Sequence, residues 1–190
     1  MLFNRFSKIP YDNLTITNII TSLSSIYKEV EKEFTLQEYT IKGAPRPEQL
    51  AYTLYNNPNY EWTLLLVNDI IDPFHGWVRH SDTIYQTAEI LYKNEPEGIN
   101  SNHHHYDPET DEVYYDLVEY PNESKMWYHT GDIDHERVQF VGDLVPVTNI
   151  EYELEKNEDM RDILIVAPNH IERFVTRITG LLNERNNTRY

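Results

Sequence analysis

Three consecutive histidines, His103, His104 and His105, are the residues of this chain whose type most directly suggests chemistry, because imidazole is the commonest transition-metal ligand. They lie in a segment with strand character, and successive side chains of a strand point to opposite faces. Only His103 and His105 would then face one ion, and a third ligand such as Asp116 or His129 would have to come from a neighbouring strand. A solvated hairpin strand accounts for the same residues, so we predict no metal site and no cofactor.

The other reactive residue types form no catalytic pattern. Among 32 Asp and Glu residues, no pair is set apart by apolar surroundings, as a glycosidase or a peptidoglycan lyase would require. Asp69 and Asp72 lie in turn-forming sequence, where carboxylates bond backbone amides. No serine stands in a Gly-x-Ser-x-Gly elbow, the 6 glycines form no phosphate loop, and the absence of cysteine excludes a thiol nucleophile and disulfides. We predict that the protein is not an enzyme.

Aromatic residues are more informative. The chain holds 15 Tyr, 6 Phe and 3 Trp, and many of them lie in its hydrophilic middle. Tyr and Trp provide large contact areas at low entropic cost and concentrate at interfaces. We therefore expect Tyr114, Tyr115, Tyr120 and Trp127 at a contact surface, whereas Trp62 is expected to fill a core.

The charge is concentrated in the middle of the chain. The formal net charge is −16, and residues 94–162 hold 19 Asp and Glu against 4 Lys and Arg. Such a surface repels phosphate backbones and anionic membranes and suits a basic protein partner. The longest apolar run, residues 64–67, is far too short to cross a membrane, and the N-terminus does not resemble a signal peptide. We expect a soluble protein without nucleic-acid or membrane partners.

The N-terminal 35 residues predict an extended arm followed by an amphipathic helix over residues 17–34. The arm carries Phe3, Phe6 and Ile9 without helical period. Together with the apolar helix face, these residues exceed what a small core covers, so we expect them to contact partners and to depend on partners for order.

Residues 36–77 predict a strand followed by two short helices. Residues 36–41 alternate and are rich in β-formers, and Pro47 suits the first turn of a helix. Asn57 and Pro58 end that helix, and Asn59 is expected to cap the next. Two helices this short need a sheet beneath them. The expected core of this unit comprises Leu50, Leu54, Trp62, Leu66, Trp77, Ile163 and Ile165.

The remaining segments predict an insertion and a closing strand. A helix is expected after Ser81, a β-hairpin over residues 102–118, and a capping box from Thr148 and Glu151. The apolar run at residues 163–166 is too short for a helix and has the strongest strand character among candidate partners for residues 36–41. We therefore expect these two strands to pair antiparallel, followed by a C-terminal helix.

Several of these features together resemble a known family. The strand, the Pro-Arg-Pro-Glu helix start, the Trp62 helix and the Asn-Asp, Asp-Pro and Gly-Trp exit are similar to the LysM-like core of the baseplate wedge protein 53 family of T-even-like contractile-tailed phages. The similarity extends to the C-terminal segment NEDMRDILIVAPNHIERFV and covers most of residues 36–180.

The resemblance implies an α+β fold with a LysM-like core, made of a two-stranded antiparallel sheet with two short helices. The expected divisions are an arm and helix (1–35), the first part of the core (36–77), a long acidic, aromatic-rich insertion (78–160) and a closing strand with the C-terminal helix (161–190).

The resemblance also implies a structural virion protein. It would be a baseplate wedge subunit, assembled in the host cytoplasm, that joins other wedge and tail proteins in six copies or a multiple of six. The alternative is a peptidoglycan-binding LysM-type module that acts at the cell wall during infection. A module of that kind is ordinarily tethered by a flexible linker to a catalytic domain, and the chain contains neither.

Overall fold

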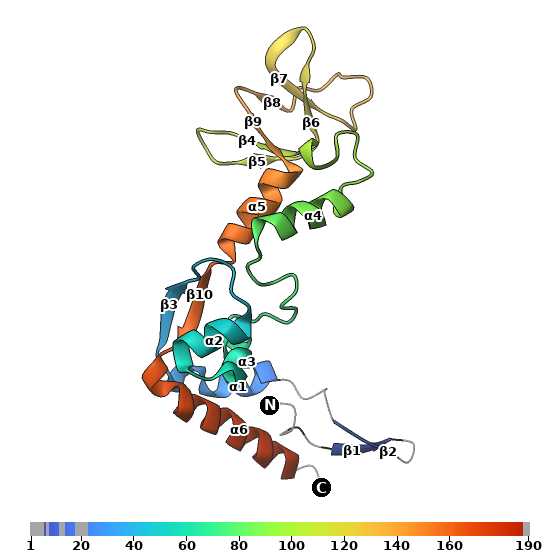
Figure 1. Ribbon diagram of the computed structural model, residues 1–190. Coiled ribbons are helices and arrows are strands. Elements are labelled where there is room, and N and C mark those ends of the chain that lie inside the picture. Colours follow the sequence, from blue (N-terminus) through green and yellow to red (C-terminus); the bar gives the residue numbers. More distant parts are fainter. Residues whose placement is uncertain (1–5, 7, 12–13, 18–22, 188–190) are drawn as a thin grey trace. The chain divides into compact units, whose positions relative to one another are not determined.

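The computed structural model describes residues 6, 8–11, 14–17 and 23–187, which mix helices and sheets and divide into two compact units (Figure 1). Unit 1 comprises Met1–Arg79 and Asp159–Tyr190, and unit 2 comprises His80–Glu158. Each unit has its own apolar clusters and is described separately.

Unit 1 contains four strands and four α-helices in its described part. The strands are β1 (Lys8–Tyr11), β2 (Leu14–Thr17), β3 (Leu36–Thr40) and β10 (Asp162–Val166). The α-helices are α1 (Leu23–Val30), α2 (Pro47–Tyr55), α3 (Glu61–Val67) and α6 (Ile171–Asn187), with short 3-10 helices at Glu31–Glu33, Pro58–Tyr60 and Pro168–His170.

Local sequence signals fix the two short helices. Pro47 occupies the first turn of α2, where its missing amide costs nothing, and α2 ends at Asn56 in the left-handed conformation with φ 53°. The side chain of Asn57 accepts a hydrogen bond from the Asn59 amide at 3.0 Å. Asn57 therefore caps the following turn, and the prediction that Asn59 caps the second helix is wrong.

The predicted pairing of the two distant strands is confirmed. β3 and β10 form a two-stranded antiparallel sheet in which Tyr39 lies opposite Ile163 and Gln37 opposite Ile165. Figure 1 shows α2 and α3 on one side of this sheet. Ile163 and Ile165 are buried beneath them, which satisfies the need of the short helices for an apolar support.

The core of unit 1 consists of two apolar clusters. The first joins α1 and α6 and includes Phe174, Ile178 and Leu182, each fully buried. The second lies between the sheet and α2, and it contains the predicted core residues Leu50, Trp77, Ile163 and Ile165, with Leu54 half-buried at its margin. The predicted core residues Trp62 and Leu66 pack against the first cluster instead. The Trp62 ring stacks on Phe174 with a centroid distance of 6.4 Å.

The N-terminal region departs from the prediction. Leu14–Thr17 is a strand paired with β1, and the described helix covers only Leu23–Val30, so the predicted helix over residues 17–34 is wrong in extent. Phe6 was expected to contact a partner, but it is 5% exposed and belongs to the first cluster of its own chain. Burying an aromatic side chain on an uncovered apolar helix face of the same chain lowers the free energy of the isolated protein, whereas leaving it exposed to solvent does not. Phe3 and the side chain of Ile9 lie outside the described residues.

Unit 2 contains six strands and two α-helices. The strands are β4 (Asn102–Tyr106), β5 (Val113–Tyr114), β6 (Leu117–Tyr120), β7 (Glu123–His129), β8 (Phe140–Val141) and β9 (Val145–Thr148). They form two antiparallel sheets with strand orders β5-β4-β9 and β6-β7-β8. The predicted hairpin of residues 102–118 is present in part, as β4 and β5, because residues 117–118 belong to β6 of the second sheet. The helices are α4 (Ser81–Leu91) and α5 (Asn149–Asp159), with a 3-10 turn at Gly98–Asn100.

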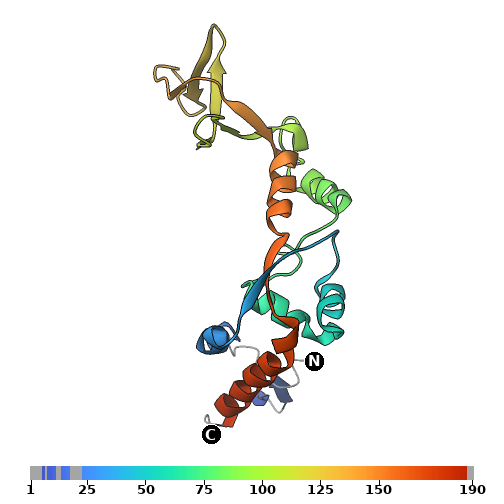
Figure 2. The same ribbon diagram turned by 90° about the vertical axis from the view of Figure 1, so that its left-hand side faces the viewer.

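The two helices of unit 2 pack together. Figures 1 and 2 show them side by side, and Ile84 and Ala88 of α4 are buried with Ile150 of α5. The predicted capping box opens α5, because Glu151 Oε2 accepts from the Thr148 amide at 2.8 Å and the Glu151 amide donates to Thr148 Oγ1 at 3.3 Å.

Candidate interaction surfaces

The aromatic residues expected at a contact surface separate into core and surface positions. Trp127 is 9% exposed, packs with Leu117 and Leu144, and donates its ring N–H to Gly142 O at 3.0 Å. The prediction that Trp127 lies at an interface is therefore wrong, because its position in β7 faces the apolar interior of unit 2. Tyr114 also packs on this cluster, and its ring lies 4.9 Å from that of Phe140.

Tyr120 and Tyr115 remain accessible to different degrees. Tyr120 is half-buried, its ring lies 4.8 Å from Tyr128, and its hydroxyl donates to His135 O at 2.9 Å. Tyr115 is 57% exposed, so it has most of its surface available for a partner.

Tyr115 belongs to the wall of a pocket in unit 2, which we call the acidic–aromatic pocket. The pocket has a volume of about 770 Å³. It is lined by the aromatic residues Tyr106, Tyr115 and Tyr152, the acidic residues Asp111, Glu151 and Glu155, and His104, Val113, Val145, Pro146 and Val147. Hydrogen bonds from Thr148 lower the pKa of Glu151, which keeps that carboxylate charged. Lys156 Nζ lies 5.8 Å from the Tyr152 ring centroid, so the carboxylates with Tyr106 and Tyr115 are the groups that suit the binding of a further cationic side chain.

The histidines beside this pocket are not arranged as predicted. The pairing of β4 with β9 shifts register between Asn102 and His104, which is the mark of a β-bulge. His103 and His104 therefore meet instead of pointing apart, and their Nδ1 atoms lie 2.8 Å from each other. The His103 ring stacks on Tyr152 at 3.9 Å, and burial lowers the pKa of both His103 and His105. Within residues 23–187 and the described N-terminal residues, no three His, Asp or Glu side chains are grouped to hold a metal ion.

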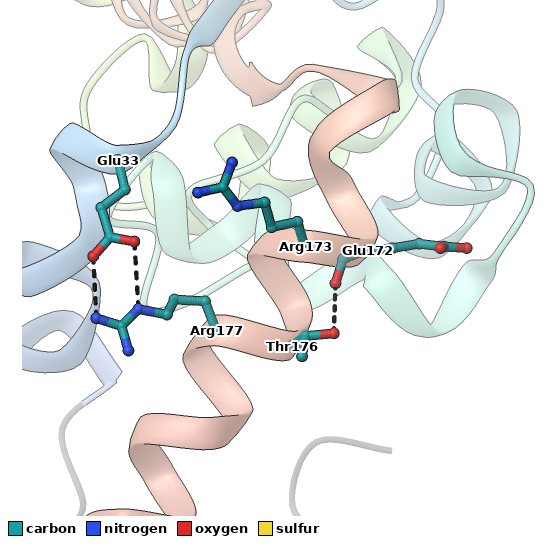
Figure 3. A pocket seen from close by; sticks show the side chains of 5 residues that line it. All are labelled: Glu33, Glu172, Arg173, Thr176 and Arg177. Atoms are coloured by element: carbon teal, nitrogen blue, oxygen red, sulfur yellow. Dashed lines mark hydrogen bonds and ion pairs between the residues drawn. The ribbon is translucent and has the colours of Figure 1, made fainter.

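A shallow hollow on α6 of unit 1 has a lining of mixed charge (Figure 3). It has a volume of about 550 Å³ and is lined by Glu33, Glu172, Arg173, Thr176 and Arg177. Arg177 donates to both carboxylate oxygens of Glu33, at 3.3 and 3.2 Å, and this pairing raises the Arg177 pKa. Arg173 has no ion-pair partner in the described part of the chain, and its guanidinium lies 5.6 Å from the Phe34 ring centroid. Arg173 is therefore available to a carboxylate from outside.

The turn between α3 and Trp77 displays two apolar side chains that sequence reasoning missed. Ile71 is 91% exposed and Phe74 is 81% exposed. Asp72 fixes the turn, because its Oδ1 accepts from the Phe74 amide at 2.9 Å and its backbone oxygen accepts from the Gly76 amide at 2.8 Å. A hydrogen bond from His75 is the main cause that lowers the Asp72 pKa. The signal that could have revealed this feature is the presence of Ile and Phe inside a stretch of turn-forming residues.

A family model described as base plate wedge protein 53 matches residues 1–181. The chain belongs to this family. A curated relative, the baseplate wedge protein gp53 of Enterobacteria phage T4, is 32% identical over 193 residues, which cover 97% of each chain. The family takes its name from a structural component of the baseplate and not from a reaction.

One further observation concerns membranes. Across the helices of the described residues, none combines the length and the apolar character that a bilayer crossing demands.

Proposed function

We propose that the chain is a structural subunit of the baseplate wedge of a contractile phage tail, where it joins neighbouring wedge proteins through protein–protein contacts. The observation that carries this proposal is the similarity to the T4 baseplate wedge protein over 97% of both chains. A match from end to end argues for the same role more strongly than a match to one module. In this proposal the chain is assembled in the host cytoplasm, lies in the virion baseplate in six copies or a multiple of six, and binds neither nucleic acid nor membranes.

The surfaces of both units support a joining role. Ile71 and Phe74 stand on a turn held by hydrogen bonds to the side chain and the backbone oxygen of Asp72, so their burial by a partner costs little backbone entropy. The acidic–aromatic pocket suits a Lys or Arg of one neighbour, and Arg173 suits a carboxylate of another. Each unit therefore has a surface that can contact a different partner.

We also propose that β3, α2, α3 and β10 form the LysM-like core of the chain and that this core serves protein contact. The order strand, helix, helix, strand and the antiparallel pairing of the two strands support this assignment. A peptidoglycan-binding role is the competing proposal. A pull-down of the full chain on purified peptidoglycan separates them, because a wedge connector stays in the supernatant and a cell-wall module sediments with the peptidoglycan.

The joining role is tested by complementation. A phage that lacks this chain is supplied with the wild-type chain or with the double variant Ile71→Ser, Phe74→Ser, and tails are counted by electron microscopy. The exposed side chains contribute little to folding, so we expect an unchanged melting temperature and a loss of complete baseplates. The matched control is Tyr52→Ser, which removes a side chain that is 59% exposed on α2, outside the turn. Normal baseplates with the double variant would refute a contact role for this turn.

The acidic–aromatic pocket is tested by reversing its charge. The variant Glu155→Lys places a cation in the pocket, whereas the control Glu89→Lys makes the same change on the exposed side of α4. We expect baseplate assembly to fail with Glu155→Lys and to proceed with Glu89→Lys. Equal assembly with both variants would show that the pocket does not receive a basic side chain.

A further inference from the structure

The two strands of the unit 1 sheet differ in whether the backbone N–H and C=O groups at their outer edges have hydrogen-bond partners. The Ile41 amide donates to Arg161 O at 2.8 Å, so residues 41 and 161 form a hydrogen-bonded pair. Bonded and non-bonded pairs alternate along an antiparallel ladder. With the observed register, the backbone groups of residues 37 and 39 bond to β10, whereas those of residues 36, 38 and 40 point away from it.

Side chains close the outer edge of β10. Asn68 donates to Leu164 O at 2.7 Å and accepts from the Leu164 amide at 2.7 Å, as a neighbouring strand would. Asn68 is itself held by a bond to Leu64 O at 2.8 Å. The Tyr55 hydroxyl donates to Val166 O at 3.0 Å. No further strand is needed on this side.

The outer edge of β3 has no comparable cover. Within the described part of the chain, the backbone N–H and C=O of Glu38 have no hydrogen-bond partner, and Gln37, Glu38 and Thr40 are exposed. Figure 1 shows that β3 has β10 on one side and no other strand on its outer side. Free edges are usually protected by Lys or other charged residues, Pro, a bulge or short length; the five-residue β3, LQEYT, carries one charge, Glu38, has no Lys or Pro, and pairs regularly.

We propose that the outer edge of β3 binds an extended segment of a neighbouring wedge protein, which adds a third strand to the sheet. This inference rests on the proposed function, because it specifies how the joining contact is made. Main-chain hydrogen bonds to Glu38 and its flanking positions provide affinity, and side chains at alternate positions provide specificity.

The charges around the strand define the chemistry of the partner. A hollow of about 830 Å³ adjoins the same sheet, and its charged lining residues are Glu38, Asp69 and Asp162. The segment therefore carries Lys or Arg opposite Glu38.

A second copy of this chain does not fit the edge. Two β3 strands in full antiparallel overlap would place Glu38 directly opposite Glu38 of the other copy, and like charges in that position are destabilising. The formal net charge of −16 adds repulsion between the copies.

The test removes the outward amide without touching the sheet. Glu38→Pro deletes the N–H that faces the partner, and proline is tolerated on an edge strand. Glu38→Gln keeps the N–H and removes only the charge, while Tyr39→Pro deletes an N–H that bonds to β10. Each full-length variant is melted in isolation and supplied to a phage that lacks the chain, and its copies per baseplate are measured.

We expect the melting temperature of Glu38→Pro to lie within about 4 °C of wild type. Its number of copies per baseplate should be about tenfold lower than that of the wild-type chain, a factor that corresponds to a modest loss of binding free energy. Glu38→Gln should retain most incorporation, and Tyr39→Pro should fail to fold. Wild-type incorporation of Glu38→Pro would overturn the proposal and leave the baseplate role intact. Absence of the wild-type chain from baseplates would overturn both.

Hydrogen exchange provides a readout that does not depend on the proline variant folding. In the isolated wild-type chain the Glu38 amide should exchange at least about tenfold faster than the Tyr39 amide, and in assembled baseplates both should be protected. A Glu38 amide that exchanges equally fast in both states would overturn the proposal even if Glu38→Pro proves unfolded.

Discussion

Substitutions at two adjacent positions of β10 test the sheet that organises unit 1. Ile165 is 4% exposed and faces α2 and α3, whereas Leu164 is 39% exposed on the other face. Ile165→Asp removes a buried isoleucine side chain, which lowers the free energy of unfolding by about 2–5 kcal/mol. It also places an unpaired charge in an apolar site, which lowers it by several kcal/mol more. Since whole domains are stable by only about 5–15 kcal/mol, Ile165→Asp should unfold unit 1. Leu164→Asp should cost about 1–2 kcal/mol, because its side chain is already partly in water but the new carboxylate lies opposite Glu38.

Tryptophan fluorescence during urea unfolding measures this difference. Trp62 and Trp77 report on unit 1 and Trp127 reports on unit 2, so the Trp127→Phe background isolates the signal of unit 1. The milder pair Ile165→Ala and Leu164→Ala gives the size of the effect, with expected losses of about 2–5 and about 1 kcal/mol in the free energy of unfolding. Equal losses at the two positions, or a larger loss at Leu164, would refute the arrangement of buried and exposed faces described here.

Three further predictions concern unit 2 and the exposed turn. Thr148→Ala removes the hydroxyl that receives the Glu151 amide and should lower the stability of unit 2 by about 1 kcal/mol, measured from the unfolding of Trp127. The pKa values of His103 and His105 are lowered in the folded state, so the unfolded chain binds more protons as the pH falls below the ordinary value of 6.5. The stability that the neutral histidines contribute is complete above that pH and is lost as the pH falls through their folded pKa values. Replacing both with Gln should flatten this pH dependence of the free energy of unfolding, measured by urea titration. Phe74→Ser alone should leave the melting temperature within about 2 °C of wild type, and a larger fall in a thermal scan would show that Phe74 packs on its own chain.

Short-range sequence signals predicted α2, the start of α5 and several strands correctly, whereas the helix predicted over residues 17–34 is wrong in extent. Pro47 at a helix start and the Thr148–Glu151 capping box act within one turn, and their effects depend little on the rest of the fold. The long-range pairing of β3 with β10 was also predictable, because Ile163 and Ile165 are the apolar strand residues that the short helices require.

The failures lie where packing or a local irregularity overrides the pattern. Phe6 is flanked by polar residues and Trp127 lies in the hydrophilic middle of the chain, yet each is buried against residues of other segments. Periodicity within a segment cannot reveal such partners. The bulge after Asn102 brings His103 and His104 together, and one extra residue in a ladder leaves no distinct mark in the amino-acid sequence.

The candidate surfaces were only partly predictable. Composition indicated an acidic, aromatic contact region, and Tyr115 with Glu151 and Glu155 forms part of its pocket. The open edge of β3 was not predicted, because it depends on Asn68 and Tyr55 closing the other edge of the same sheet. That asymmetry exists only after the chain has folded.

The most direct test of the central claim is the position of this chain in intact virions. Cryo-electron microscopy of the tail should show it in the baseplate, between neighbouring wedge proteins, in six copies or a multiple of six. A baseplate without this chain, or a copy of it bound to the cell wall apart from the tail, would contradict its role as a wedge subunit.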